Sequence, residues 1–236
     1  MANLLVSGDS WTSFWPLEEK LGHRNGGWPS LVSDYFGYNL IDKSRAGSSN
    51  YRIYRKAFEG ILDTDVDLVI VFLTSWIRNE SGATYGEKPG RIYQHLPSDK
   101  DVFALFFNSY LQYSDSLRMI ISLQALSEKT KKQCYFLDTF KNNISRNLKI
   151  KEFKKMLQLN PDVFNNMDDE RIENKFSKIK SLENNIDWDK FISQKSYEEL
   201  IGGYPLIKKH PGKGGHKKMS EIVIQFIKEV NNAKAI

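Results

Sequence analysis

The chain has 236 residues, of which 40% are hydrophobic and 27% are charged, and its net charge is +5. This composition is typical of an ordinary globular protein with enough apolar residues to bury a core, and it excludes a fibrous or low-complexity protein. The single cysteine, Cys134, excludes an internal disulfide, and its apolar neighbours predict a buried, inert thiol.

Apolar runs and helical spacing predict alternating strands and helices over the first 140 residues. In chain order we expect a strand at 2–7, a helix at 28–36, a strand at 38–42, a helix from about Asn50 to Ile61, a strand at 66–73, a loop at 79–90, a helix at about 101–127 and a strand at 133–140. The β-branched run at 66–73 does not alternate with polar residues, which indicates a central parallel strand covered on both faces. Alternation of this kind predicts a doubly wound parallel α/β sheet.

The region 141–200 interrupts this rhythm, because it is rich in Asn and in charges of both signs and carries aromatic residues at wide intervals. We interpret it as a helical insertion or lid packed on the sheet edge. Residues 1–236 are therefore expected to form a single domain with that insertion. An amphipathic helix at about 216–231 ends the chain.

Small or polar residues follow three of the predicted strands, at 8–10, 46–50 and 74–76, and the chain returns with a polar segment at 209–216. Loops at the carboxyl ends of parallel strands converge on one crevice. A serine hydrolase needs a serine at a helix N-terminus, a histidine within hydrogen-bond reach and donors for the developing oxyanion. These segments contain all three.

The order of these segments resembles that of the SGNH (GDSL-type) hydrolases, which are esterases and deacetylases on a flavodoxin-like α/β/α fold. "SGDSWT" matches their first block, so the resemblance gives Ser10 the role of nucleophile. "AGSSN" matches the second block and implies that the backbone N–H of Gly47 donates to the oxyanion. "HPGKGGH" matches the last block and makes His210 the general base. The resemblance covers about residues 1–80 and 200–230.

This chain departs from the family's third block. That block usually reads Gly-x-Asn-Asp, and its Asn side chain donates to the oxyanion. Here the strand is followed by Thr74-Ser75-Trp76, so that Ser75 or Trp76 takes the Asn position. The Ser75 hydroxyl is our first choice as the oxyanion donor, the Trp76 indole N–H is an alternative, and Asn79 is a weaker one.

The family's acid, three residues before the histidine, is also missing, because that position is Ile207. An acid that orients the imidazole contributes strongly to rate in serine proteases. A backbone carbonyl could do part of that work, and three carboxylates of the insertion could reach the site: Asp187, Asp189 and Glu199.

Several neighbouring residues have a structural and a functional interpretation. Asp9 is expected to hold the turn by hydrogen bonds to backbone groups, and Asn50 to cap the following helix. His216 is interpreted as structural, and a metal site formed by His210 and His216 is not expected, because their spacing is not that of a helical ligand pair. Two tryptophans, Trp11 and Trp76, fit core packing and a sugar-stacking wall equally well.

We therefore predict a serine esterase or deacetylase that hydrolyses a small acyl ester, with an acetylated carbohydrate as first candidate substrate and without a metal or cofactor. The alternative is a non-catalytic SGNH-like binding or structural module. We expect no nucleic-acid partner, because the basic run at 208–218 has no interleaved aromatics that could stack on bases. The absence of an apolar run of ~18 residues and of a signal peptide predicts a cytoplasmic protein without a membrane span, and packaging into a larger particle is compatible with this pattern.

Overall fold

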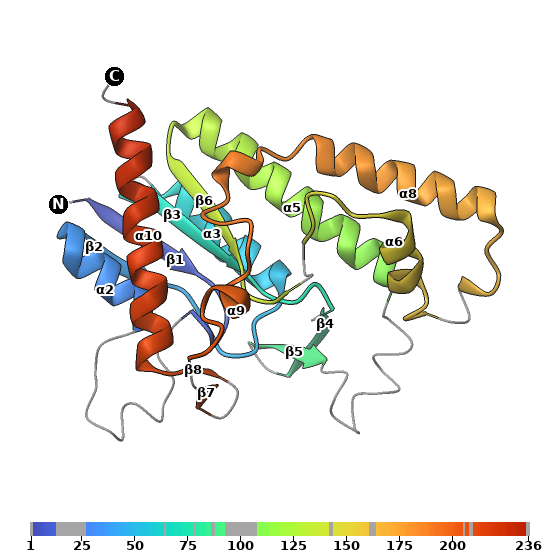
Figure 1. Ribbon diagram of the computed structural model, residues 1–236, viewed down its shortest axis with the longest axis horizontal. Coiled ribbons are helices and arrows are strands. Elements are labelled where there is room, and N and C mark those ends of the chain that lie inside the picture. Colours follow the sequence, from blue (N-terminus) through green and yellow to red (C-terminus); the bar gives the residue numbers. More distant parts are fainter. Residues whose placement is uncertain are drawn as a thin grey trace.

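The centre of the molecule is a parallel sheet with the strand order β2-β1-β3-β6 (Figure 1). Its strands are β1 (Asn3–Ser7), β2 (Asn39–Asp42), β3 (Leu68–Leu73) and β6 (Gln133–Asp138). This is the flavodoxin-like order. The computed structural model describes residues 2–12, 27–63, 65–77, 79–85, 88–92, 108–141, 144–160, 164–204, 206–207 and 210–234.

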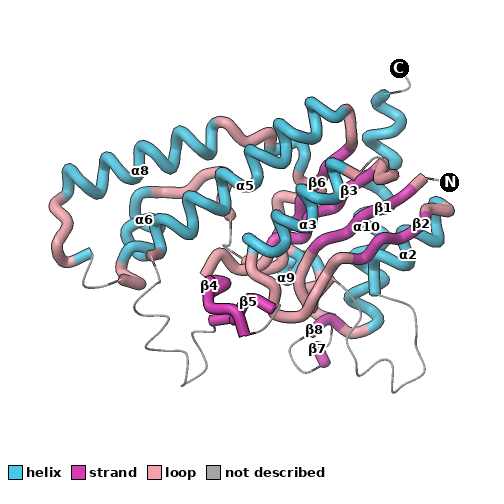
Figure 2. Tube along the Cα trace, turned by 180° about the vertical axis from the view of Figure 1, so that it is seen from behind, coloured by secondary structure: helices cyan, strands magenta, loops and turns pink. Residues whose placement is uncertain are grey.

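Helices cover both faces of the sheet and produce three α/β/α layers (Figures 1 and 2). One face carries α2 (Gly27–Phe36) and α10 (Lys213–Lys234), which also pack against each other, and the opposite face carries α3 (Asn50–Leu62) and α5 (Ser109–Thr130). The three-layer α/β/α fold expected from the sequence is thus confirmed.

The side chains of β1 show why its apolar run has no polar alternation. Leu4 and Val6 pack under α2 and α10, whereas Leu5 packs under α3 and α5. Because successive side chains of a strand point to opposite faces, a strand covered on both sides needs apolar residues at every position. All six residues of β3 are buried for the same reason.

The insertion consists of α6 (Ile150–Leu157), α8 (Asp169–Asn184), the 3₁₀ turn η2 (Trp188–Lys190) and the short helix α9 (Tyr197–Leu200). Both α6 and α8 pack against α5 and against each other, so they extend the helical layer on that side (Figures 1 and 2). The segment at Phe191 reaches the sheet edge, where it forms a parallel bridge with Phe136 of β6. The expectation that the insertion packs on the sheet edge is therefore correct for the segment at Phe191. It is wrong for α6 and α8, whose apolar residues face α5.

Four local differences separate the structure from the expected elements. The stretch expected as a loop at 79–90 contains an antiparallel hairpin of β4 (Asn79–Tyr85) and β5 (Lys88–Ile92). Because these strands lack an apolar run, their composition gave no strand signal.

A second short hairpin pairs β7 (Leu206–Ile207) with β8 (His210–Pro211), and α10 begins before the expected position 216. The start of the helix expected at 101–127 lies partly outside the described residues, and α5 begins at Ser109 with Asn108 as its N-cap.

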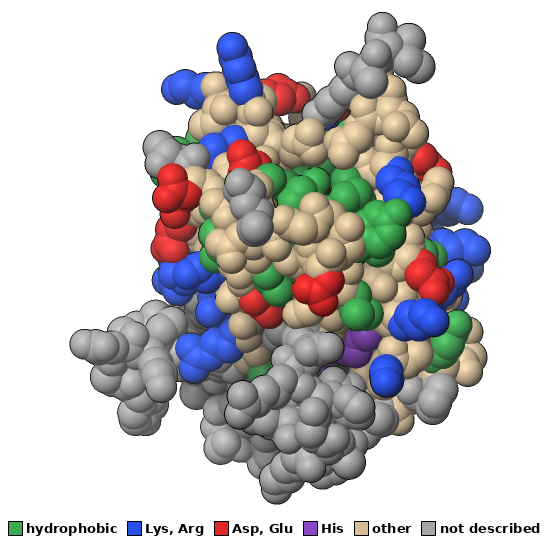
Figure 3. All heavy atoms as spheres, turned by 90° about the vertical axis from the view of Figure 1, so that its left-hand side faces the viewer, with side chains coloured by type: hydrophobic (Ala, Val, Ile, Leu, Met, Phe, Trp, Pro, Cys, Tyr) green, Lys and Arg blue, Asp and Glu red, His purple; other side chains and the backbone are tan. Residues whose placement is uncertain are grey.

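The described surface and interior also bear on the expected partners. Within the described segments, no helix combines the length and the apolar character needed to cross a membrane. On the face shown in Figure 3, Lys and Arg side chains are interspersed with Asp and Glu, so positive charge is not gathered into one patch there. Cys134 is buried as expected, and this burial raises the pKa of its thiol.

Candidate active site

Ser10 and His210 meet at the carboxyl end of the sheet although 200 residues separate them. Directly after β1 the chain turns, and the N–H of Thr12 donates to the carbonyl of Asp9 at 3.1 Å, which places Ser10 inside the turn. From the β7–β8 hairpin, the Nε2 atom of His210 lies 2.9 Å from the Oγ of Ser10. This separation is within the range of a hydrogen bond.

The turn that carries Ser10 is held by the buried carboxylate of Asp9. Its Oδ1 accepts from the N–H of Trp11 at 2.9 Å, and its Oδ2 accepts from the hydroxyl of Thr74 at 2.7 Å. The carboxylate thus joins the turn after β1 to the end of β3. This agrees with the structural role that the sequence suggested for Asp9.

Gly8 is required by the close packing of the same turn. A Cβ atom at this position would lie 1.9 Å from the Oγ1 of Thr12 and 2.8 Å from the Cβ of Phe72. Real Cβ atoms do not approach other atoms so closely, so a side chain at this position would push the turn away from β3. The Gly-Asp-Ser order is therefore explained by packing and hydrogen bonding around Ser10.

The loop with Gly47 lies beside this turn. The N–H of Arg45 donates to the carbonyl of Gly8 at 3.1 Å, which joins the loop after β2 to the turn after β1. Gly47 has a φ of 67°, in the left-handed region that glycine adopts without strain. The α3 helix starts three residues later, so its positive end is at this side of the sheet.

The expectation that Asn50 caps α3 is wrong, because Ser49 is the N-cap and its Oγ accepts from the N–H of Arg52. Asn50 instead joins three elements. Its Oδ1 accepts from the N–H of Thr74 at 2.8 Å, and its Nδ2 donates to the Oγ of Ser116 on α5 at 3.4 Å. Asn50 therefore stabilises the end of β3 through its side-chain amide.

The segment after β3 contains the residues considered for the third oxyanion donor. Ser75 is half-buried, and its Oγ accepts from the N–H of Ile77 at 3.4 Å. Trp76 is only 9% exposed and packs edge-on against Tyr113 of α5, with ring centroids 5.9 Å apart. Asn79 is the first residue of β4.

Trp11 is also a core residue, since its ring packs edge-on against Phe140 and Tyr197. Of the two interpretations of Trp11 and Trp76, the structure favours core packing over an exposed sugar-stacking wall.

Ile207 lies directly opposite His210 in the β7–β8 hairpin. Of the carboxylates considered as substitutes for the missing acid, two are used in local caps of the insertion. Asp187 accepts from the N–H of Asp189 at the start of η2. Glu199 accepts from the N–H and hydroxyl of Ser196 in a capping box, and these bonds lower the pKa of its carboxyl.

His216 has a different environment from His210 although both belong to the same terminal segment. It is 5% exposed, its Nδ1 accepts from the N–H of Trp28 at 3.3 Å, and the hydroxyl of Tyr197 lies 3.4 Å from the same nitrogen. Burial, and to a lesser degree the nearby His210, lower the pKa of His216 to about 4. The ring is therefore neutral at pH 7 and joins α10 to the start of α2 and to α9, as a structural histidine would.

Sequence reasoning missed the hydrogen-bond network that supports the site. Thr74 donates through its hydroxyl to Asp9 and through its N–H to Asn50, and Asn50 continues to Ser116. The one available signal was a threonine immediately after the central strand, where a buried polar group needs partners. Its partners are remote in the sequence, so they could not be identified from spacing.

Comparisons with solved structures find proteins with a similar fold. A psychrotrophic esterase from Pseudoalteromonas has a TM-score of 0.52 and 14% identity, over 98% of this chain and 100% of that chain. A variant of an acetylxylan esterase from Geobacillus stearothermophilus has a TM-score of 0.51 and 13% identity, over 96% of this chain and 95% of that chain. A lipolytic protein of the G-D-S-L family from Desulfitobacterium hafniense has a TM-score of 0.50 and 13% identity, over 96% of this chain and 99% of that chain.

No protein-family model and no curated protein matches the sequence. At these identities the structural likeness establishes the fold. The chain has the fold of the SGNH (GDSL-type) hydrolases, as its sequence motifs predicted.

Proposed function

We propose that the protein is a serine esterase of the SGNH type that removes a small acyl group, acetyl as first candidate, from a carbohydrate. The observation that carries this proposal is the 2.9 Å contact between the Oγ of Ser10 and the Nε2 of His210 at the carboxyl end of the sheet. The similarity in fold to an esterase and to an acetylxylan esterase supports the same reaction class and the carbohydrate substrate.

In the proposed reaction the Oγ of Ser10 attacks the acyl carbon, and its proton moves to the Nε2 of His210. The tetrahedral intermediate collapses when the imidazolium returns this proton to the departing alkoxide, which leaves as an alcohol. Water then loses a proton to His210 and attacks the acyl-Ser10 ester. Collapse of the second intermediate releases the carboxylic acid and restores Ser10.

The developing oxyanion would be stabilised by the backbone N–H groups of Ser10 and Gly47, with the Ser75 hydroxyl as third donor. The hydrogen bond from the N–H of Arg45 to the carbonyl of Gly8 supports this, because it joins the loop that contains Gly47 to the turn that contains Ser10. Ser75 accepts a bond from Ile77, and a hydroxyl that accepts one bond retains its proton for donation.

A second candidate function is a non-catalytic module that binds a ligand in the same crevice. Two observations favour it. Ile207 occupies the position of the usual acid and pairs with His210 in the hairpin, and Trp76, one of the two candidates for the Asn position, packs in the core against Tyr113.

Turnover of p-nitrophenyl acetate and labelling by a fluorophosphonate probe separate the two functions. We expect stoichiometric labelling and measurable turnover in the wild type, and loss of both in Ser10→Ala. Ser193→Ala is the matched control, because within the described residues the Ser193 hydroxyl accepts a local bond from the N–H of Lys195 and has no contact with Ser10. A folded wild type that neither reacts with the probe nor turns over the ester would refute the esterase and support the binding module.

A further inference from the structure

Thr74 lies at the end of β3, between the two loops that carry the proposed oxyanion donors. The residue is fully buried, and its hydroxyl and its N–H have different partners. The hydroxyl donates to the Oδ2 of Asp9 at 2.7 Å, directly before Ser10 in the chain. The N–H donates to the Oδ1 of Asn50 at 2.8 Å, three residues after Gly47. Thr74 is therefore bonded to both loops.

The bond to Asp9 determines how the turn at Ser10 is held. The carboxylate of Asp9 also accepts from the N–H of Trp11 at 2.9 Å, and its backbone carbonyl accepts from the N–H of Thr12 at 3.1 Å. In the part of the chain that the structure describes, no hydrogen bond occupies the N–H of Ser10 itself. This N–H can thus donate to an oxyanion, and its direction depends on Asp9. A bond from a hydroxyl to a carboxylate is short and strong, so Thr74 holds Asp9 firmly.

The bond to Asn50 holds the loop after β2 against the same strand. Asn50 is the first residue of α3, and its buried Nδ2 donates to the Oγ of Ser116 on α5 at 3.4 Å. The loop that contains Gly47 leads directly into α3, so its position relative to β3 depends on this side chain. The strand β3 is a firm support, because it is buried along its whole length and pairs with β1 and β6.

We propose that Thr74 is a positioning residue for the esterase reaction, because it sets the separation of the Ser10 and Gly47 N–H groups. This inference rests on the proposed function. Donors stabilise the transition state only when they are aimed at the place that the oxyanion will occupy, and a displacement of about 1 Å can lower the rate about a hundredfold. Threonine suits this role, since its branched side chain restricts χ1 and thereby the position of the hydroxyl oxygen.

Thr139 provides a matched control at the end of the neighbouring strand. It follows β6 as Thr74 follows β3, the two strands pair with Leu73 opposite Asp138, and both threonines are fully buried. Among the described residues, the hydroxyl of Thr139 has no hydrogen-bond partner. Thr139→Val therefore removes a buried hydroxyl at the same level of the sheet without removing a bond to the turn at Ser10.

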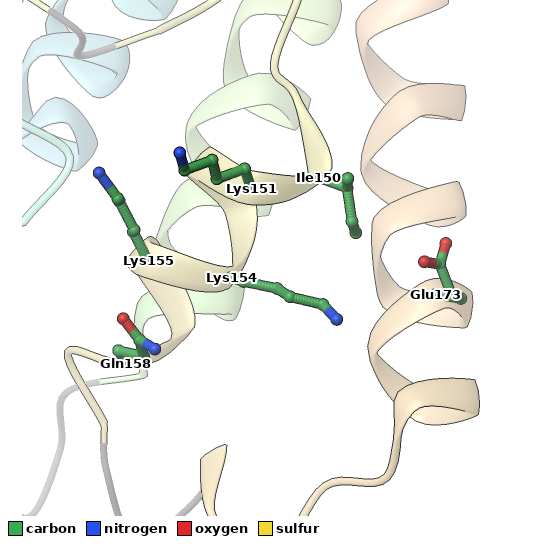
Figure 4. Close-up of a pocket in the computed structure, with 6 residues that line it drawn as sticks. All are labelled: Ile150, Lys151, Lys154, Lys155, Gln158 and Glu173. Atoms are coloured by element: carbon green, nitrogen blue, oxygen red, sulfur yellow. The ribbon is translucent and has the colours of Figure 1, made fainter.

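A surface control comes from the groove between α6 and α8 (Figure 4). Lys154 extends across this groove toward α8, and its Nζ lies 3.0 Å from the Oδ1 of Asp169. The pair is solvent-exposed, and the two helices that carry it pack on α5. Lys154→Gln should therefore leave turnover unchanged.

Steady-state hydrolysis of p-nitrophenyl acetate tests the proposal at a temperature at which circular dichroism shows every variant to be folded. We expect Thr74→Val to lower kcat about tenfold to a hundredfold with little change in KM, because it removes stabilisation made only in the transition state. Thr74→Ser keeps the hydroxyl and should recover most of this loss, whereas Thr139→Val should match the wild type. Wild-type kcat in folded Thr74→Val, or an equal loss in Thr139→Val, would overturn the inference.

Asn50→Ala tests the second bond, because it removes the acceptor of the Thr74 N–H. We expect the same fall in kcat with little change in KM. This variant also decides the inference if Thr74→Val does not fold. Unchanged kcat in folded Asn50→Ala would overturn it.

Hydrogen exchange distinguishes this inference from the proposed function, because it requires no catalysis. The N–H of Trp11 donates to the same carboxylate as the Thr74 hydroxyl, so we expect it to exchange about tenfold faster in Thr74→Val and at the wild-type rate in Thr139→Val. If the wild type has no turnover but this difference is found, the proposed function is refuted and the control of the Ser10 turn by Thr74 stands. Equal exchange in an active enzyme would refute the role of Thr74 and leave the esterase.

Discussion

The turn at Ser10 and the insertion beside it are stabilised in different ways. The turn depends on directional hydrogen bonds of buried side chains, among them Asp9 to Thr74 and Asn50 to Thr74. The helices of the insertion depend on apolar packing against α5, for which Phe153 and Ile179 are fully buried. Hydrogen bonds fix atoms within fractions of an ångström, whereas apolar contacts tolerate replacement by groups of similar volume. The comparison teaches that α6 and α8 can change their surface without moving Ser10, whereas α9 contacts the turn through Tyr197, whose ring packs against Trp11.

The largest expected effect comes from Asp9→Ala. Without the carboxylate, the N–H of Trp11 and the hydroxyl of Thr74 lose a buried acceptor, at a cost of about 1–3 kcal/mol of unfolding free energy each. A displacement of Ser10 by about 1 Å would lower turnover about a hundredfold. Urea unfolding and p-nitrophenyl acetate turnover measure the two effects, with the exposed Asp34→Ala as control. Unchanged turnover per folded molecule in Asp9→Ala would contradict the role of the carboxylate in holding Ser10.

Ile179→Ala tests the other side of the comparison. Ile179 of α8 is fully buried in the cluster with α5, so its truncation should reduce the unfolding free energy by about 2–5 kcal/mol. Turnover of p-nitrophenyl acetate by the folded fraction should stay at the wild-type value, because the residue has no contact with the turn at Ser10. A stable variant with impaired turnover would show that the insertion and the turn are coupled.

His216→Gln should change how stability depends on pH. The folded pKa of about 4 is below the unfolded value of about 6.5, so the unfolded state binds a proton that the folded state excludes. Stability contributed by this residue is complete above pH 6.5 and is lost as pH falls from about 6.5 to about 4, by on the order of 3 kcal/mol. Glutamine does not titrate, so urea unfolding of the variant should show a shallower decline across this range. An equally steep decline in both proteins would contradict the assignment.

The smallest effect is expected for Lys154→Gln. The ion pair of Lys154 with Asp169 is solvent-exposed, and such pairs contribute about 0–1 kcal/mol. Urea unfolding should show a change within this range, reduced further by added salt. A loss of several kcal/mol would mean that charge pairing, and not apolar packing alone, holds α6 against α8.

The sequence alone was sufficient to predict the parallel sheet and the helices that cover it. Through the resemblance of two short blocks to a known family, it also predicted that Ser10 and His210 lie close together. Apolar runs such as 68–73 and the spacing of apolar residues in α10 are local patterns, and they report directly on burial. The two blocks with Ser10 and His210 carried enough specific residues to indicate the SGNH fold, which the structural comparisons confirm.

Other features were decided only by tertiary structure. Asn50 was expected to cap a helix and instead joins β3 to α5, because its partners Thr74 and Ser116 are remote in sequence. The burial of Trp76 depends on the position of α5, and the groove beside Lys154 depends on how α6 packs on α8. A sequence pattern specifies which residues prefer to be buried, but the partner of a buried polar group and the shape of a groove follow from how distant segments meet.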